Sequence, residues 1–240
     1  MTRSSVRALL VGVGGLGCPA AMALSRAGIG VLGLCDDDVV ERANLHRQIL
    51  FTDNDVGKPK VQAAAEALKG LAPDLHVNVH SHRLLPENAV ELVGAYDVVL
   101  EGSDNFATKF LTADACALAG VPVVHASAVR WIGTVMSVGA EGKPCYRCLF
   151  EDIPPDGAAN CAEAGVMGPV VGIVSAIQVD LALALLEGKP VEGELVTFDG
   201  RLDQVRRRSV RPRSGCSLCG QSCRIRRIDP DAYASPAYAG

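Results

Sequence analysis

The segment that most constrains the fold is residues 6–38, where a run of glycines joins an apolar stretch to one that favours a helix. Val6–Val11 is aliphatic, Cys18–Ala27 is rich in alanine, and Ile29–Leu34 is again apolar. A G-x-G-x-x-G pattern, Gly12–Gly17, lies between the first two. Strand, glycine turn, helix and strand in this order predict one βαβ unit of a doubly wound sheet.

The same segment predicts a nucleotide site. Glycines allow the backbone to turn tightly and to approach a phosphate, and the N-terminus of the following helix presents free N–H groups. Asp36, at the tip of the second strand and about 20 residues after the last glycine, can accept hydrogen bonds from ribose hydroxyls. A tight turn without a ligand is the alternative, but the acid at the strand end favours nucleotide binding. The candidate loop residues are Gly12, Gly14, Gly15 and Gly17.

The alternation of strands and helices continues beyond residue 38. We predict helices at residues 61–70, 106–120 and 168–187, with a short one within 84–94. Strands are predicted at residues 75–79, 96–100 and 121–125. Antiparallel strands are predicted at residues 131–138 and 143–150, and further strands within 194–210. This order predicts an α/β fold with a doubly wound, mostly parallel, Rossmann-like sheet that antiparallel strands extend. One domain would span residues 1–224, with a nucleotide-binding half up to about residue 130. Residues 151–165 are predicted to be a loop and residues 225–240 a disordered tail.

Composition narrows the class of protein. At 240 residues and 49 % hydrophobic content, the chain suits one large domain. A net charge of −4 and an aromatic content of 4 % argue against nucleic-acid binding. The apolar run Val170–Leu186 includes Gln178 and Asp180 and is shorter than the roughly 20 residues of a membrane span. Because glycines interrupt the N-terminal apolar run, it lacks the form of a secretory signal. We therefore expect a cytoplasmic protein that binds neither nucleic acid nor membrane.

Nine cysteines in such a chain indicate metal binding or reactive thiols rather than disulfides. Four of them form two C-x-x-C pairs, Cys145 with Cys148 and Cys216 with Cys219. Four thiolates in a tetrahedron suit a closed structural zinc site. Since the pairs are roughly 70 residues apart, the predicted site would connect distant segments of the chain.

Polar residues follow the predicted parallel strands at their carboxyl ends, where doubly wound folds bind ligands. Asp36 and Asp38 share a face if the strand continues, and Asn44 and Arg47 project together from a helical turn. Lys60 lies at the start of the next helix, where the positive end of the dipole disfavours a cation unless an anion is bound. It is either an ordinary surface lysine or, beside the nucleotide loop, a candidate phosphate ligand. The next strand end carries Ser103, Asp104 and Asn105.

Nine arginines lie between positions 201 and 227, with few acids among them. One interpretation is a solvated face, and the other is a docking patch for an acidic partner protein. The sequence pattern leaves both open.

Seven motifs follow one another along the chain: GVGGLG, D-x-D-x-V-x-x-x-N-L-x-R-Q from Asp36, G-K-P-K from Gly57, S-D-N from Ser103, P-C-Y-R-C from Pro144, C-A-E-A-G-V-M-G-P from Cys161, and C-x-x-C from Cys216. In this order they resemble the MoeB/ThiF/HesA family of sulfur-carrier adenylyltransferases, the bacterial relatives of ubiquitin-activating enzymes. The resemblance covers nearly the whole chain.

The resemblance implies that ATP and Mg²⁺ adenylate the C-terminal Gly-Gly carboxylate of a ubiquitin-like sulfur-carrier protein of the ThiS or MoaD type, with release of pyrophosphate. It implies that Gly15 lies near the nucleotide, that Asp36 binds the ribose and that Asp104 binds Mg²⁺. The resemblance also implies that three residues, Arg47, Lys60 and Asp104, are catalytic. The other residues that it implies at the nucleotide are Asp38, Asn44, Gln48 and Asn105. The four paired cysteines would hold structural Zn²⁺, and the protein would be a homodimer.

Cys161 matches a cysteine that links covalently to the carrier in thiamine-pathway members of the family. Members that serve molybdopterin carry a cysteine there without needing it for adenylation, so both roles stay open. We expect no rhodanese-like sulfurtransferase domain after Cys223, and therefore a separate sulfur donor.

The residue types fit the implied chemistry, because negative charge accumulates on the pentacoordinate phosphorus and on the leaving pyrophosphate. Arginine, lysine and Mg²⁺ stabilise that charge more in the transition state than in the ground state. Two alternatives remain. A non-catalytic ATP-binding scaffold would share the fold. An NAD(P)-dependent oxidoreductase would share the glycine loop and Asp36, but it leaves Arg47, Lys60 and the cysteine pairs unexplained.

Overall fold

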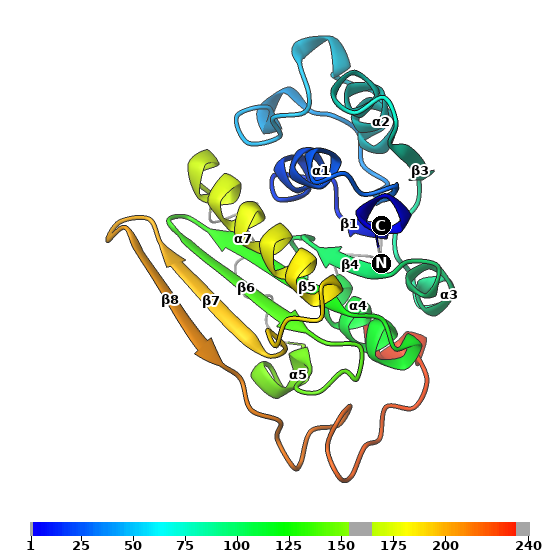
Figure 1. Cartoon of the computed structure of the whole chain (residues 1–240), viewed down its shortest axis with the longest axis vertical. Helices are drawn as coiled ribbons and strands as arrows, with labels where there is room; N and C mark the ends of the chain where they lie inside the picture. The colour runs from blue at the N-terminus through cyan, green and yellow to red at the C-terminus, as the bar shows by residue number, and fades with distance from the viewer. Residues whose placement is uncertain (1, 154–164, 234–240) are drawn as a thin grey trace.

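The computed structural model describes residues 2–153 and 165–233, which form an eight-stranded mixed sheet with helices on both faces (Figure 1). The strand order is β3-β2-β1-β4-β5-β6-β7-β8. The strands are β1 (Arg7–Val11), β2 (Val31–Cys35), β3 (His76–His80), β4 (Val98–Glu101), β5 (Val123–Val129), β6 (Ile132–Val138), β7 (Glu194–Asp199) and β8 (Gln204–Ser209). β1 to β5 pair in parallel, and β6 to β8 continue from β5 in antiparallel pairs. The predicted α/β class, with a mostly parallel sheet extended by antiparallel strands, is confirmed.

Each face of the sheet has its own hydrophobic core. Strand side chains alternate, so in β1 Ala8 and Leu10 join the core of one face and Leu9 and Val11 that of the other. Burial on both faces explains why the central strands are apolar throughout. The helices α1 (Gly17–Arg26), α2 (Lys60–Leu71) and α7 (Gly168–Leu186) cover the first face, and α3 (Ala89–Gly94), α4 (Phe106–Ala119) and α5 (Tyr146–Leu149) cover the second.

Within the described ranges, α7 is the one helix that is long and apolar enough to cross a membrane. Half of its most apolar window is buried inside this fold. The helix packs on β5 and β6 and against α1, and Figure 1 shows it lying across these strands. Its hydrophobicity is thus that of a helix covering a sheet, as we expected.

The sheet order places an opening beside β1. Successive strands run outward from β1 to β2 and β3 on one side, and the chain then returns to β4 on the other side. The connections therefore diverge at the carboxyl ends of β1 and β4, which is where doubly wound folds leave a crevice for a ligand.

The prediction of an antiparallel strand over residues 143–150 is wrong. These residues form a turn followed by the short helix α5. Residues three apart point to opposite faces of a strand but to one face of a helical turn. Cys145 and Cys148 must reach a common point, and the turn, with Cys148 N–H donating to the Cys145 carbonyl, allows this.

The prediction of a disordered tail from residue 225 onward is also wrong as far as Tyr233. Residues Pro230–Tyr233 form the 3-10 helix η4. Tyr233 is 6 % exposed, and its hydroxyl donates to Asp114 Oδ2 over 2.6 Å. A buried hydrogen-bonded aromatic residue thus holds this segment against α4.

Candidate functional site

A cleft of about 450 Å³ opens at the carboxyl ends of β1, β2 and β4. Almost all of the residues predicted for the nucleotide site line it: Gly12, Gly14, Gly15, Asp36, Asp38, Asn44, Arg47, Gln48, Lys60, Asp104 and Asn105. Five separate stretches of sequence converge here because parallel strands end at the same edge of the sheet. Cys161 lies outside the described residues.

Gly17 does not line the cleft, and its position explains why a glycine is needed there. A Cβ on Gly17 would lie 2.1 Å from the carbonyl oxygen of Gly12. Gly12 itself has a φ of +92°, which L side chains rarely adopt. The first glycine therefore makes the turn, and the last lets helix α1 begin directly against it.

Asp36 connects the end of β2 to the glycine loop. Its carboxylate accepts hydrogen bonds from Val13 N–H at 2.7 Å and from Asp38 N–H at 2.9 Å. Burial raises the pKa of Asp36 above its usual value, and the nearby Lys60 and these N–H donors oppose that rise. Asp36 is thus positioned by the backbone beside the turn where a bound nucleotide would lie.

Lys60 and Arg47 both line the cleft and provide positive charge there. Lys60 is the first residue of α2, and its Nζ lies 2.7 Å from Asp38 Oδ2. The Asp38 carboxylate therefore partly balances the charge of this buried lysine at the helix N-terminus. The Arg47 side chain lies across Gly15, where a Cβ would be 3.2 Å from Arg47 Cδ. Arg47 N–H donates to the Asn44 carbonyl, so both residues belong to one turn, as predicted.

The turn after β4 forms the opposite side of the cleft. Asp104 is exposed, whereas Asn105 is half-buried and caps α4 by accepting from Thr108 N–H at 2.8 Å. Both residues also line a second, smaller cavity of about 130 Å³, between α4, β6 and α5. An exposed carboxylate oxygen at the cleft is the kind of ligand that Mg²⁺ prefers.

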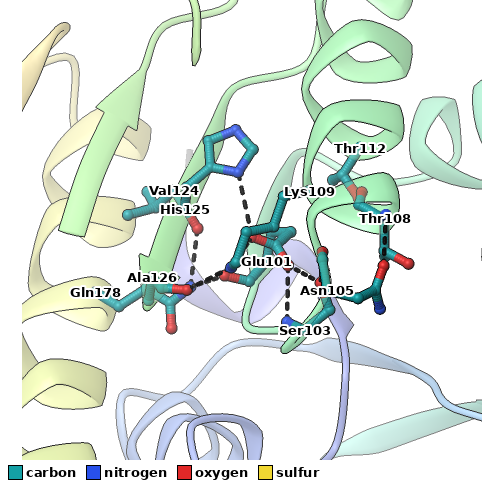
Figure 2. A network of polar contacts seen from close by, with 10 residues as sticks. All are labelled: Glu101, Ser103, Asn105, Thr108, Lys109, Thr112, Val124, His125, Ala126 and Gln178. Carbon is teal, nitrogen blue, oxygen red and sulfur yellow. Dashed lines mark hydrogen bonds and ion pairs between the residues drawn. The ribbon is translucent and has the colours of Figure 1, made fainter. Parts of the chain in front are cut away.

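A buried polar network lies directly beneath this turn, and our sequence predictions did not include it (Figure 2). It joins Glu101, Lys109, His125 and Gln178, which come from β4, α4, β5 and α7. One signal was available: Lys109 lies among apolar residues of a helix expected to face the core. The sequence could not identify its partners, which lie on other elements.

Arg83 and Glu41 also line the cleft and were not predicted. Arg83 Nε donates to Asp37 Oδ2 over 2.7 Å. Arg83 follows the carboxyl end of β3, a parallel strand, so its place after a strand end was the one signal available for it.

The four paired cysteines come together as predicted. Their Sγ atoms all lie within 4.8 Å of one another. Neighbouring Sγ atoms are 3.8 Å apart for Cys145–Cys148, 3.4 Å for Cys145–Cys216 and 3.3 Å for Cys148–Cys219. A zinc ion with Zn–S bonds of about 2.3 Å requires edges of about 3.8 Å, so the four thiols fit a closed tetrahedral site.

Replacement of Cys216 by serine is expected to reduce zinc content well below one ion per chain and to lower the melting temperature, since metal binding stabilises the fold that presents the ligands. Elemental analysis and calorimetry would measure both. Cys223→Ser is the matched control, because Cys223 lies outside the cluster. One zinc per chain retained in Cys216→Ser would contradict the four-cysteine site.

The arginine-rich segment places three arginines on β8, the edge strand of the sheet. All residues of β8 are exposed. Arg207 pairs with Glu194 on the neighbouring strand, whereas Arg206 and Arg208 share the opposite face. The structure thus presents a positive edge on the antiparallel half of the sheet.

Fold and cleft together define a doubly wound α/β protein with a polar cleft at the carboxyl ends of its parallel strands. The chain belongs to the ThiF family, whose sequence profile matches residues 2–218.

Curated relatives agree with this assignment. The chain is 45 % identical over 217 residues to the adenylyltransferase and sulfurtransferase MOCS3 of Drosophila grimshawi, covering 88 % of this chain and 48 % of that protein. It is 40 % identical over 220 residues to the SAMP-activating enzyme E1 of Haloferax volcanii, covering 90 % of this chain and 81 % of that protein. The chain spans about half the length of the MOCS3 relatives it matches.

Solved structures share the fold. The crystal structure of E. coli MccB with ATP matches with a TM-score of 0.77 at 20 % identity, over 91 % of this chain and 68 % of that one. A structure named PaaA matches with a TM-score of 0.73 at 23 % identity, over 87 % and 65 % of the two chains.

Proposed function

We propose that this protein is an ATP-dependent adenylyltransferase that activates the C-terminal Gly-Gly carboxylate of a ubiquitin-like sulfur-carrier protein and releases pyrophosphate. The observation that carries the proposal is the convergence of Arg47, Lys60 and Asp104 on one cleft beside the glycine loop. The names of the relatives, an adenylyltransferase and an activating enzyme E1, support it.

In this proposal each part of the cleft has one task. The glycine loop and the N-terminus of α1 receive phosphate oxygens, and Asp36 receives the ribose hydroxyls. Arg47 and Lys60 stabilise the negative charge that develops when the carrier carboxylate attacks the α-phosphorus. Such charge stabilisation acts mainly in the transition state. A carboxylate is already ionised near pH 7, so no side chain has to act as a strong base.

Asp104 is the residue that would hold Mg²⁺, because its exposed carboxylate lies at the cleft and hard cations prefer oxygen ligands. When bound, Mg²⁺ would neutralise charge on the phosphate oxygens. We also assign Zn²⁺ to Cys145, Cys148, Cys216 and Cys219 in a structural role.

We place the carrier on the antiparallel half of the sheet, next to the positive edge formed by β8. Reversal of charge in Arg206→Glu with Arg208→Glu is expected to raise the KM for the carrier by about tenfold or more and to leave ATP affinity unchanged. Kinetics at two salt concentrations would measure this effect, since screening weakens such steering.

The matched control for that double variant is Arg26→Glu with Lys69→Glu, which changes the net charge equally on exposed residues of α1 and α2. An equal rise in KM in the control would show that net charge matters rather than the β8 edge.

We further propose a cytoplasmic homodimer that receives sulfur from a separate donor, and we leave both roles of Cys161 open.

The test is ATP–[³²P]pyrophosphate exchange with and without candidate carriers that end in Gly-Gly. Exchange that depends on a carrier supports acyl-adenylate formation and identifies the partner. ATP binding without exchange, for every carrier tried, would overturn the proposal in favour of a scaffold. Binding of NAD(P) in preference to ATP would favour the oxidoreductase.

A further inference from the structure

The carboxylate of Glu101 is completely buried beside Ser103 and Asn105, which flank Asp104 in the sequence (Figure 2). Oε1 accepts from both the N–H and the hydroxyl of Ser103, the N–H at 2.7 Å. Oε2 accepts from Lys109 Nζ at 2.7 Å and from His125 Nδ1 at 3.3 Å. Both oxygens are thus occupied by donors from three elements.

Lys109 closes the network on the side of α4. Its Nζ also donates to the Ala126 carbonyl at 2.7 Å, and its backbone N–H donates to the Asn105 carbonyl at 3.3 Å. A closed ring therefore runs from Glu101 to Ser103 by hydrogen bonds, along the backbone to Asn105, and through Lys109 back to Glu101. Within residues 101–105, the ring leaves Asp104 as the exposed residue.

The surroundings of Glu101 determine the direction in which its pKa is shifted. Burial by itself would raise the pKa of Glu101, but the charge of Lys109 and the hydrogen bonds from His125 and Lys109 hold it below its usual value. The carboxylate is therefore ionised under the conditions in which ATP is used. A buried ion pair contributes little net stability compared with an apolar pair of similar volume.

Neither Glu101 nor Lys109 lines the nucleotide cleft, although Lys109 borders the smaller cavity that Asp104 and Asn105 also line. We propose that Glu101 and Lys109 are positioning residues that hold the Ser103–Asn105 turn and thereby set the Asp104 carboxylate for Mg²⁺. This inference rests on the proposed role of Asp104 in ATP-dependent chemistry. It predicts that the loss of the pair affects metal dependence more than stability.

The experiment replaces the pair by apolar residues of similar size, Glu101→Leu with Lys109→Met. The first readout is ATP affinity, measured by calorimetry with Mg²⁺ and with a chelator. We expect the gain in affinity that Mg²⁺ provides to fall about tenfold. The second readout is pyrophosphate exchange, in which the half-saturating Mg²⁺ concentration should rise by a similar factor.

The control is Asp114→Leu with Arg147→Met, which removes a second buried ion pair, whose described side-chain hydrogen bonds involve none of residues 101–109. It should leave the Mg²⁺ dependence unchanged. The single variant Lys109→Arg keeps the positive charge beside Glu101, so it should retain much of the Mg²⁺ dependence of the unaltered protein. An unchanged Mg²⁺ dependence in Glu101→Leu with Lys109→Met would overturn the proposal, as would an equal change in the control.

If the double variant does not fold, Ser103→Ala takes its place, because it removes the hydroxyl contacts of this half-buried residue with the Glu101 carboxylate and the Asn105 carbonyl and keeps the Glu101–Lys109 ion pair. A rise of at least threefold in half-saturating Mg²⁺ supports positioning, and no rise overturns it. The calorimetric readout needs no carrier, so it separates this inference from the proposed adenylation. Failure of the unaltered protein to bind ATP would overturn both.

Discussion

Replacement of Asp104 by asparagine is expected to lower the rate of carrier-dependent pyrophosphate exchange by about 10²- to 10³-fold. Asparagine has nearly the same shape but lacks the charge that would attract Mg²⁺ to the cleft. Because Asp104 is exposed, the substitution leaves no buried group without a partner. The melting temperature and zinc content should therefore match those of the unaltered protein.

Asp203→Asn is a suitable control for Asp104→Asn. Asp203 is exposed, lies outside the cleft and has a φ of +51°, a conformation that asparagine tolerates. Its exchange rate should be unchanged. Full exchange activity in Asp104→Asn would remove Asp104 from the mechanism and with it the proposed metal ligand.

Replacement of Arg147 by methionine is expected to produce the largest loss of stability, about 3–5 kcal/mol. Arg147 lies inside the first cysteine pair and donates to the fully buried Asp114, with Nε and Nη2 at 2.9 Å and 2.8 Å from its carboxylate oxygens. Removal of the guanidinium leaves that carboxylate buried with Tyr233 as its remaining described donor. For a chain of this size the melting temperature should fall by about 10 °C or more.

Two further variants separate the effect of the unpaired charge from that of lost packing. Adding Asp114→Leu to Arg147→Met removes the stranded carboxylate and should recover much of the lost stability. Tyr233→Phe removes one hydrogen bond to a charged group and should cost about 1.5–3 kcal/mol. Denaturant unfolding would measure the free energy of unfolding of Arg147→Met and of these two further variants. Wild-type stability in Arg147→Met would show that the pair does not hold the cysteine cluster against α4.

Local sequence was enough to predict the nucleotide half of the fold. The apolar strand, the glycines and the alanine-rich helix of residues 6–38 each act through their own backbone preferences, so their order specifies a βαβ unit without reference to the rest of the chain. The candidate site could be predicted for a related reason. Parallel strands bring their carboxyl ends to one edge, so the glycine loop after Val11 and the polar residues after Cys35 and Glu101 converge there.

Residues 143–150 and the end of the chain show where local reasoning failed. A short stretch with Tyr146 and Phe150 has the composition of a strand, but the requirement that Cys145 and Cys148 face one point overrides that preference. In the same way, small residues and prolines predicted a disordered tail, whereas the Tyr233 hydroxyl donates a hydrogen bond to the buried Asp114 carboxylate. Both outcomes depend on partners from distant parts of the chain.

The sequence by itself determined the ThiF-type order of strands and helices, the glycine loop, the residues at the strand ends and the two cysteine pairs. These features are encoded in spacing and periodicity, which act over a few residues. The tertiary structure alone decided which buried charges meet: Glu101 with Lys109 beneath Asp104, and Asp114 with Arg147 beside the cysteines. A buried charge must find its partner wherever the fold places one, because an unpaired charge in the interior is too unfavourable to persist.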